Sequence, residues 1–235
     1  MCESVDEAKL ELVVARYQED LSWLRKVPKR IKPIIYNKSE HSEDFEFPSQ
    51  ERLPNVGNEA HTYLHHITQR REYLADFTIF SQGHPFDHVS DFHSILREIA
   101  TCKTFTNGFR WLGFIIDTDD AKGRLLFQNW SKNLKRELLD LDLFYEELFN
   151  RKSPKYFRFF PGAHFGVRRE QILSKPHEFY EKALEMAFSF PHAAHCFERL
   201  WDQVFGLEFV TDEMVGEQKT VYLKPIKNLE PSSKR

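Results

Sequence analysis

The chain has 235 residues, of which 41% are hydrophobic and 29% charged, so it suits one α/β domain and is short for two. Its formal net charge of −3 excludes the strongly basic surface expected of a general nucleic-acid binder. Its three cysteines, Cys2, Cys102 and Cys196, form no C-x-x-C pair, which favours a reducing, cytoplasmic setting. We expect no signal peptide, because the N-terminus is acidic, and no integral membrane segment, because no apolar run approaches about 20 residues.

Strands and helices alternate through the first half of the predicted fold. The apolar run at residues 10–15 predicts a strand, and a helix is expected from residue 21 with Asp20 as its N-cap. A second strand at 32–36 leads into a long polar loop at 37–55, and long loops in compact domains are more often functional or disordered than structural. A helix at 59–71 follows, and its apolar residues recur at i, i+3, i+4 and i+7, the spacing of a buried stripe.

A polar loop after a buried strand is the strongest candidate for a site. Residues 77–81 predict the strand, and Gly83 and Pro85 then break it into a loop that holds Gln82, His84, Asp87 and His88. Ligands of open α/β sheets bind beyond the carboxyl ends of the strands, so these side chains are well placed for binding.

The second half of the chain is predicted to be mainly helical. After a helix at 90–100 we expect an apolar strand or buried segment at 111–116 and an exposed turn at 117–123. Helices are expected at 133–149, 176–188 and 193–205, with short strands at 156–160 and 164–167 around Pro161-Gly162 and a loose tail at 226–235. The order of elements predicts an α/β fold with a largely parallel central sheet flanked by helices.

Two short motifs offer ligands for a divalent cation, each with a structural alternative. The set His84-x-x-Asp87-His88 combines imidazole and carboxylate donors, although Asp87 and His88 are equally suited to capping the next helix. Asp117 and Asp119 form a D-x-D pair that suits Mn²⁺ or Mg²⁺, or else cap a surface turn.

A carboxylate pair on the last predicted helix offers a general base. Glu198 and Asp202 lie at i and i+4, where they either act on a hydroxyl or water or pair with Arg199 on a solvated face. The chain carries no G-x-S-x-G, P-loop or G-x-G-x-x-G motif, so elbow-type serine hydrolases, P-loop NTPases and dinucleotide enzymes fit poorly, and no organic cofactor is indicated.

Five ordered blocks together resemble the domain of unknown function family 3431. They begin at Val13, Leu53, Leu74, Pro161 and His195, and the resemblance covers about residues 10–210. It therefore implies one family domain at 10–210, between an N-terminal extension at 1–9 and a C-terminal extension at 211–235.

That family in turn resembles glycosyltransferases of the GT-A type, with a single Rossmann-like domain. The resemblance implies transfer of a sugar from a nucleotide-diphosphate donor to a saccharide or other hydroxyl acceptor, with either retention or inversion, and Glu198 is the nearest match to the catalytic base of the inverting members. The residues that match the donor side are Arg16, Tyr17, Glu19, Asp20, Asn55, Gly57, Glu59, Gln82 and Gly83. Those that match the acceptor side are Pro161, Gly162, Ala163, Phe165 and Trp201.

The chain departs from the GT-A pattern at the metal-binding D-x-D. Ser81-Gln82-Gly83-His84 stands where that motif belongs, after Ala75-Asp-Phe-Thr-Ile-Phe80. Three replacements are open: a metal site of His84, Asp87 and His88, a site of Asp117 and Asp119, or a metal-free site in which Arg16 and Arg168 neutralise the diphosphate. The departure also leaves open a non-catalytic binding module or a metal-dependent hydrolase.

Overall fold

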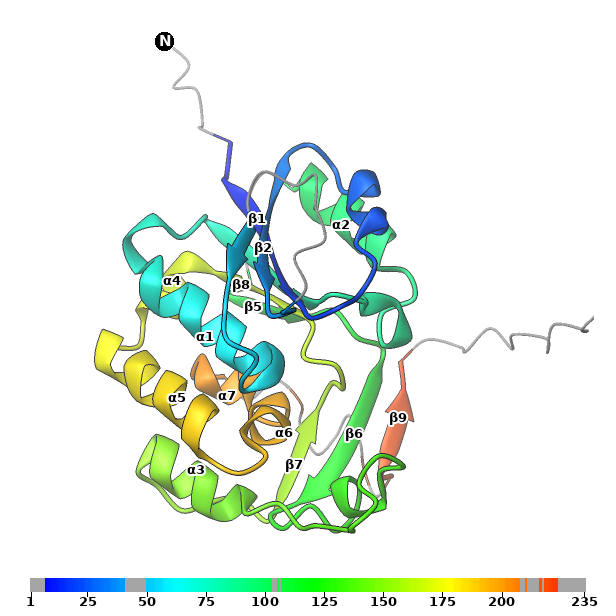
Figure 1. The fold of residues 1–235 in the computed structure, drawn as a ribbon, viewed down its shortest axis with the longest axis vertical. Helices are drawn as coiled ribbons and strands as arrows, with labels where there is room; N and C mark the ends of the chain where they lie inside the picture. Colours follow the sequence, from blue (N-terminus) through cyan, green and yellow to red (C-terminus); the bar gives the residue numbers. More distant parts are fainter. Residues whose placement is uncertain are drawn as a thin grey trace, which may run out of the picture.

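The described residues of the computed structural model, 7–40, 50–102, 105, 107–207, 210, 216 and 218–223, form two β-sheets and the helices around them (Figure 1). The larger sheet has the strand order β3-β2-β1-β4-β8-β5, and the smaller has the order β7-β6-β9. The strands are β1 (Leu10–Arg16), β2 (Ile31–Asn37), β3 (Gln50–Arg52), β4 (Phe77–Gln82), β5 (Phe109–Trp111), β6 (Ile115–Asp120), β7 (Tyr156–Phe159), β8 (Phe165–Arg168) and β9 (Thr220–Tyr222). The α-helices are α1 (Asn58–Gln69), α2 (Phe92–Thr101), α3 (Leu141–Phe149), α4 (Arg169–Leu173), α5 (His177–Ser189), α6 (Ala193–Glu198) and α7 (Trp201–Val204).

The first four strands of the larger sheet are parallel, so their carboxyl ends meet at one edge. In the register, Ala15 of β1 lies opposite Gln82 of β4, and Arg16 lies opposite Asn37 of β2. The next strand, β8, runs antiparallel to both β4 and β5. This arrangement confirms the predicted α/β fold with a largely parallel sheet.

Alternation along β1 explains the two cores on either side of the larger sheet. Val13 and Ala15 belong to a cluster that includes residues of α1, α5 and α6, whereas Leu12 and Val14 belong to a cluster that includes residues of α2. Successive side chains of a strand point to opposite faces, so one apolar run supplies both cores. The aromatic side chains concentrate in the first cluster, around Phe165.

A buried chain of hydrogen bonds fixes α1 on the larger sheet. The His66 ring contacts the Tyr36 hydroxyl through Nδ1 at 3.0 Å and Glu11 Oε1 through Nε2 at 3.1 Å. The Thr78 hydroxyl donates to the same Oε1 at 2.7 Å. Burial alone would raise the pKa of Glu11, but the interactions with His66 and Thr78 outweigh it and lower that pKa. These contacts join β1, β2, β4 and α1.

The turn predicted at residues 117–123 was wrong in its first part, because residues 117–120 lie in β6. Asp119 is fully buried and accepts hydrogen bonds from Arg199 Nε at 3.1 Å and Nη2 at 2.8 Å. It also accepts from the backbone N–H groups of Leu125, Leu126 and Phe127. A charge can be buried when it is paired and hydrogen-bonded in this way, and local sequence does not reveal a partner so distant in the chain.

Several predicted boundaries also need correction. The helix expected at 133–149 begins only at Leu141, and the helix expected at 193–205 is divided into α6 and α7. The helix expected from residue 21 is a short 3-10 turn (Ser22–Lys26), in which the Asp20 carboxylate accepts from Ser22. The long loop at 37–55 contains β3, while residues 41–49 and the tail at 226–235 lie outside the described residues.

Within the part of the chain that the structure describes, no helix has the length and apolar character needed to cross a membrane.

Candidate functional site

A pocket of about 520 Å³ opens where β1, β2 and β4 end and α1 begins. Its volume lies within the range typical of small-molecule sites, and its position is the one where open α/β sheets bind ligands. The pocket is lined by Ala15, Arg16, Tyr17, Glu19, Lys38, Asn55, Asn58, Glu59, Gln82 and Lys132. Three of these residues are cations and two are carboxylic acids.

The turn after β1 is held in shape by its own polar groups. Arg16 donates from Nε to the Glu19 carbonyl at 3.1 Å and from Nη1 to Asn37 Oδ1 at 3.1 Å. The backbone N–H of Tyr17 donates to Glu19 Oε2 at 2.7 Å. The Glu19 carboxylate in turn packs against Gly83, where an added Cβ would lie 2.6 Å from Glu19 Oε2. A larger residue at position 83 would therefore displace the Glu19 carboxylate from its place in the turn.

Lys38 extends β2 into the pocket and carries a buried ammonium. Its Nζ donates to the carbonyl of Val56 at 2.6 Å and to the carbonyl of Asn58, which ties β2 to the first turn of α1. Burial lowers the pKa of Lys38 to about 8, with the charge of Glu59 opposing the change. Lys38 is therefore a cation at neutral pH that an anionic ligand can approach from the pocket.

Glu59 has a higher pKa than an ordinary glutamate. Burial, followed by the charge of Glu198, raises the pKa of Glu59 to about 7, although Lys38 and a hydrogen bond with Gln82 oppose the shift. Near pH 7 a substantial fraction of Glu59 is therefore neutral, which leaves the pocket with an excess of positive charge.

Glu198 is close enough to Glu59 for its negative charge to raise the pKa of Glu59. Three groups interact with the Glu198 carboxylate. Its Oε1 accepts from the backbone N–H of Gly162 at 2.7 Å, while its Oε2 lies 3.4 Å from Arg199 Nη1 and 3.9 Å from His195 Nδ1. Burial alone would raise the pKa of Glu198, but these three groups outweigh it and lower that pKa. Glu198 is therefore an ionised carboxylate at neutral pH.

Two histidines pack beside the Gly162 turn that contacts Glu198. The rings of His88 and His164 are 6.2 Å apart, and an added Cβ on Gly162 would lie 2.5 Å from His88 Cδ2. Among the described residues, neither ring nitrogen of His164 has a hydrogen-bond partner. Burial, with a smaller contribution from His88, lowers the pKa of His164 to about 3, so this imidazole is neutral.

The predicted metal ligands do not form a cation site. Among the described residues, no three His, Cys, Asp or Glu side chains come together in a way that could hold a metal ion. His84 and Asp87 form an exposed pair with Nε2 and Oδ1 3.6 Å apart, while His88 packs against His164. The carboxylate of Asp119 is committed to Arg199, and Asp117 Oδ1 accepts from the Thr220 hydroxyl at 2.6 Å. The arrangement of these donors therefore does not fit Mn²⁺ or Mg²⁺.

Six of the nine residues expected on the donor side line the pocket: Arg16, Tyr17, Glu19, Asn55, Glu59 and Gln82. Gly83 contacts Glu19 behind it. The other two have local structural roles. The Asp20 carboxylate accepts from the backbone N–H and the hydroxyl of Ser22, but the N-cap of the 3-10 turn that follows is Leu21 and not Asp20 as predicted. Gly57 is the left-handed residue before α1, where an added Cβ would lie 2.4 Å from the Ala187 carbonyl oxygen.

The expected acceptor residues divide into two groups, and three of them need correction. Ala163, Phe165 and Trp201 are fully buried, so they present no surface to an acceptor. Phe165 and Trp201 pack on each other with ring centroids 5.1 Å apart, and they belong to the aromatic core. Gly162 does lie at the site, through its hydrogen bond to Glu198, and Pro161 is its half-buried neighbour.

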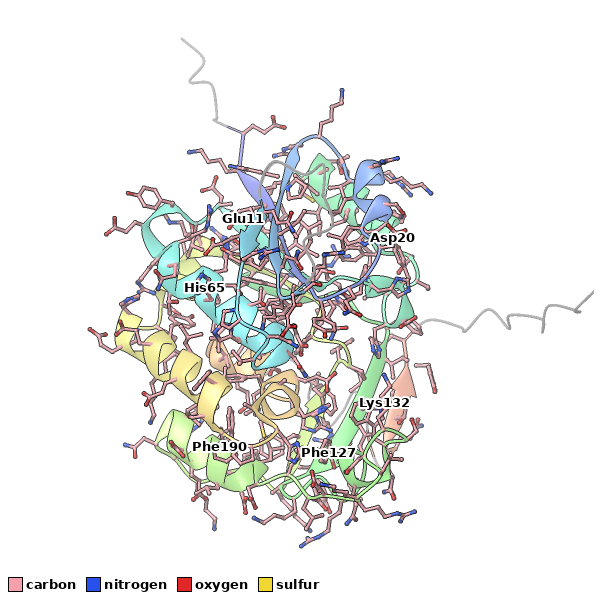
Figure 2. All side chains as sticks on the ribbon, in the orientation of Figure 1. Glu11, Asp20, His65, Phe127, Lys132 and Phe190 are labelled. Atoms are coloured by element: carbon pink, nitrogen blue, oxygen red, sulfur yellow. The ribbon has the colours of Figure 1, made fainter. Side chains whose placement is uncertain are left out.

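Sequence reasoning missed two of the three cations that line the pocket, Lys38 and Lys132. Lys38 directly follows β2, so the rule that places ligands beyond strand ends could have found it. Lys132, which Figure 2 labels, gave no such signal, because it belongs to the segment between β6 and α3 and does not follow a strand of the larger sheet. Conversely, Arg168 lies opposite Phe77 at the start of β4, at the other end of that strand from Gln82. Arg168 therefore does not serve this pocket.

Comparison with known proteins gives a family and no activity. No curated protein matches the chain. The family model described as "Protein of unknown function (DUF3431)" matches residues 12–221, which is most of the chain and includes every residue that lines the pocket. The chain therefore belongs to the DUF3431 family.

Proposed function

We propose that this protein is a glycosyltransferase of the GT-A kind, which moves a sugar from a nucleotide-diphosphate donor to a hydroxyl acceptor. The observation that carries the proposal is the convergence of Arg16, Lys38 and Lys132 on one pocket at the carboxyl ends of parallel strands. A diphosphate is an anion that needs such neutralisation, both when it binds and when it leaves. The proposal includes a cytoplasmic location. Three cysteines without a C-x-x-C pair support it, because they favour a reducing compartment.

In this proposal the pocket holds the donor. Arg16, Lys38 and Lys132 neutralise the diphosphate, and the side-chain amides of Asn55, Asn58 and Gln82 offer donors and acceptors for the ribose and the base. The partial neutrality of Glu59 avoids repulsion of the phosphate oxygens.

Glu198 acts as the base on the acceptor. As the acceptor oxygen forms its bond to the anomeric carbon, its proton passes to the Glu198 carboxylate. The bond between the anomeric carbon and the diphosphate oxygen breaks, and the diphosphate leaves with the electron pair. The Gly162 N–H and the Arg199 guanidinium hold the carboxylate in place. Because its pKa is lowered, the Glu198 carboxylate is ionised at neutral pH, which is the form that can accept a proton.

Nucleotide titration tests the donor site. We expect UDP, GDP or one of their sugars to raise the melting temperature of the protein and to bind by isothermal titration, equally with EDTA and with Mn²⁺. Lys132→Met should weaken binding about tenfold, the loss of one charge-assisted contact. Lys135→Met is the matched control, because Lys135 is exposed on the same segment, pairs with Glu137 and does not line the pocket. If none of these nucleotides binds, the proposal is wrong.

A non-catalytic binding module is the second candidate, and the absence of the D-x-D after β4 favours it. The two candidates differ in turnover. A glycosyltransferase should hydrolyse its donor slowly above background, and Glu198→Gln should reduce that rate by about 10²–10⁴-fold. Donor binding without hydrolysis would favour the module.

A further inference from the structure

Trp130 differs from the other three tryptophans of the chain by its exposure. Trp23, Trp111 and Trp201 are at most 7% exposed, whereas Trp130 is 42% exposed. Its ring lies near Lys132, whose Nζ is 5.8 Å from the indole centroid. Because Lys132 lines the candidate donor pocket, Trp130 lies close to that pocket.

The segment that carries Trp130 is held in place by buried anchors. The Asp119 carboxylate accepts the backbone N–H groups of Leu125, Leu126 and Phe127, and the Phe127 ring is buried. The Asn133 amide donates to the carbonyls of Phe127 and Glu137. An aromatic ring that is both exposed and fixed loses little conformational entropy when a ligand stacks on it.

One imidazole connects Trp130 to the proposed base. The His195 ring lies 5.0 Å from the Trp130 ring and 4.8 Å from the Phe127 ring, between centroids. Its Nδ1 lies 3.9 Å from Glu198 Oε2. The exposed indole and the carboxylate are therefore separated by a single side chain, that of His195.

We propose that Trp130 is the stacking platform of a saccharide acceptor site, which presents a sugar hydroxyl to Glu198. A pyranose ring has an apolar C–H face that packs on an aromatic ring, and polar edges that suit His195 and Glu198. The inference rests on the proposed function and deepens it, because it specifies the acceptor as a carbohydrate.

Fluorescence quenching is a direct test, because acrylamide reaches Trp130 far more readily than the three buried tryptophans. The full chain is titrated with neutral disaccharides, namely cellobiose, maltose, mannobiose and N,N′-diacetylchitobiose. At least one should protect the emission from quenching. By isothermal titration, Trp130→Ala should bind that disaccharide at least about tenfold more weakly and Trp130→Phe within about threefold, since phenylalanine keeps an aromatic face.

Three outcomes would overturn the platform. These are no protection by any disaccharide, equal disaccharide binding by Trp130→Ala, and loss of UDP or GDP binding in Trp130→Ala, which would place the nucleobase on this ring. Nucleotide titration of the same wild-type sample separates the two proposals. A protein that binds no nucleotide refutes the donor site, whereas nucleotide binding without disaccharide protection refutes only the platform.

Discussion

Glu59 lines the pocket and Glu198 lies close enough to influence its pKa, yet the pKa values of the two glutamates shift in opposite directions, which their immediate neighbours explain. Glu198 receives a backbone N–H from Gly162 and lies beside Arg199, so its pKa is lowered despite burial. Glu59 is dominated by burial and by the negative charge of Glu198, so its pKa is raised to about 7. Paired groups whose pKa values diverge in this way are typical of acid–base sites.

The raised pKa of Glu59 predicts a pH-dependent stability. The folded-state pKa of about 7 exceeds the ordinary value of 4.5, so the folded state holds its proton more tightly. Its contribution to stability is fully present below the unfolded pKa and is lost as pH rises through about 7. Relative to Glu59→Gln, the wild-type melting temperature should therefore fall between about pH 5 and pH 8.

Comparison with the variant separates Glu59, together with the Lys38 ammonium with which it interacts, from the histidines that titrate nearby. The lowered pKa values of His61 and His164 affect wild type and Glu59→Gln alike, so they cancel in the difference. A constant difference in melting temperature across this pH range would contradict the assignment.

At the residue scale, the sequence was most informative where a short motif ends a strand. Gln82 was predicted because it lies where a buried strand ends, whereas Arg16 and Glu19 were expected only from the resemblance to GT-A enzymes; all three line one pocket. Phe165 and Trp201 were misassigned because a fully buried aromatic and a ligand-stacking aromatic look the same in sequence. Only burial distinguishes them, and burial depends on the whole fold.

At the element scale, the ion pair between Asp119 and Arg199 joins β6 of the small sheet to the end of α6. Both side chains are at most 2% exposed. The same carboxylate also organises the segment with Trp130 and Lys132, through three backbone N–H groups. One buried carboxylate therefore supports two parts of the candidate site.

Removal of the negative charge of Asp119 should destabilise the protein. Asp119→Asn should lower the free energy of unfolding by about 3 kcal/mol, because it removes the nearer counterion of the buried Arg199 and leaves only Glu198, at 3.4 Å. Asp120→Asn is the matched control, since the neighbouring Asp120 accepts two backbone N–H groups, from Lys122 and Arg124, at the same turn. We expect about 1 kcal/mol for the control.

Urea unfolding of both variants provides the measurement. Equal losses in the two variants would show that Arg199 does not depend on Asp119. The Asp119→Asn variant should also make Trp130 more mobile, which its fluorescence anisotropy would report.

Elements with strong local patterns were predictable, and elements that depend on distant partners were not. The apolar stripe of α1, Ala60, Tyr63, Leu64 and Ile67, is fully buried as its spacing predicted. In β6, by contrast, three aspartates disfavour a strand locally, and the distant Arg199 makes burial of Asp119 possible. Tertiary contacts overrode local propensity there.

At the scale of the whole molecule, the connection between β7 and β8 passes from the small sheet to the large one. Gly162 lies in that connection with φ of +90°, and an added Cβ would meet the rings of both His88 and His164 at under 3 Å. Its N–H also holds Glu198. The junction of the two sheets and the proposed base therefore depend on the same glycine.

Gly162→Ala should destabilise the protein by about 3 kcal/mol, which combines the cost of positive φ with steric overlap. Gly216→Ala is the control, because Gly216 has φ of +58° and no described atom within 4 Å of an added Cβ. The control should lose only about 1 kcal/mol, a fall of about 2–4 °C in melting temperature for a chain of this size. Similar melting temperatures for the two variants would exclude the predicted overlap at Gly162.

The position of β8 has a consequence for biosynthesis. This strand lies between β4 and β5 in the sheet, but it follows both in the chain. Until Phe165 arrives to pack on Phe80 and Phe109, the facing edges of β4 and β5 lack their partner strand. Unpaired apolar sheet edges promote intermolecular pairing. Nascent or truncated chains that end before residue 165 are therefore aggregation-prone, and solubility during synthesis depends on how soon β8 closes the sheet.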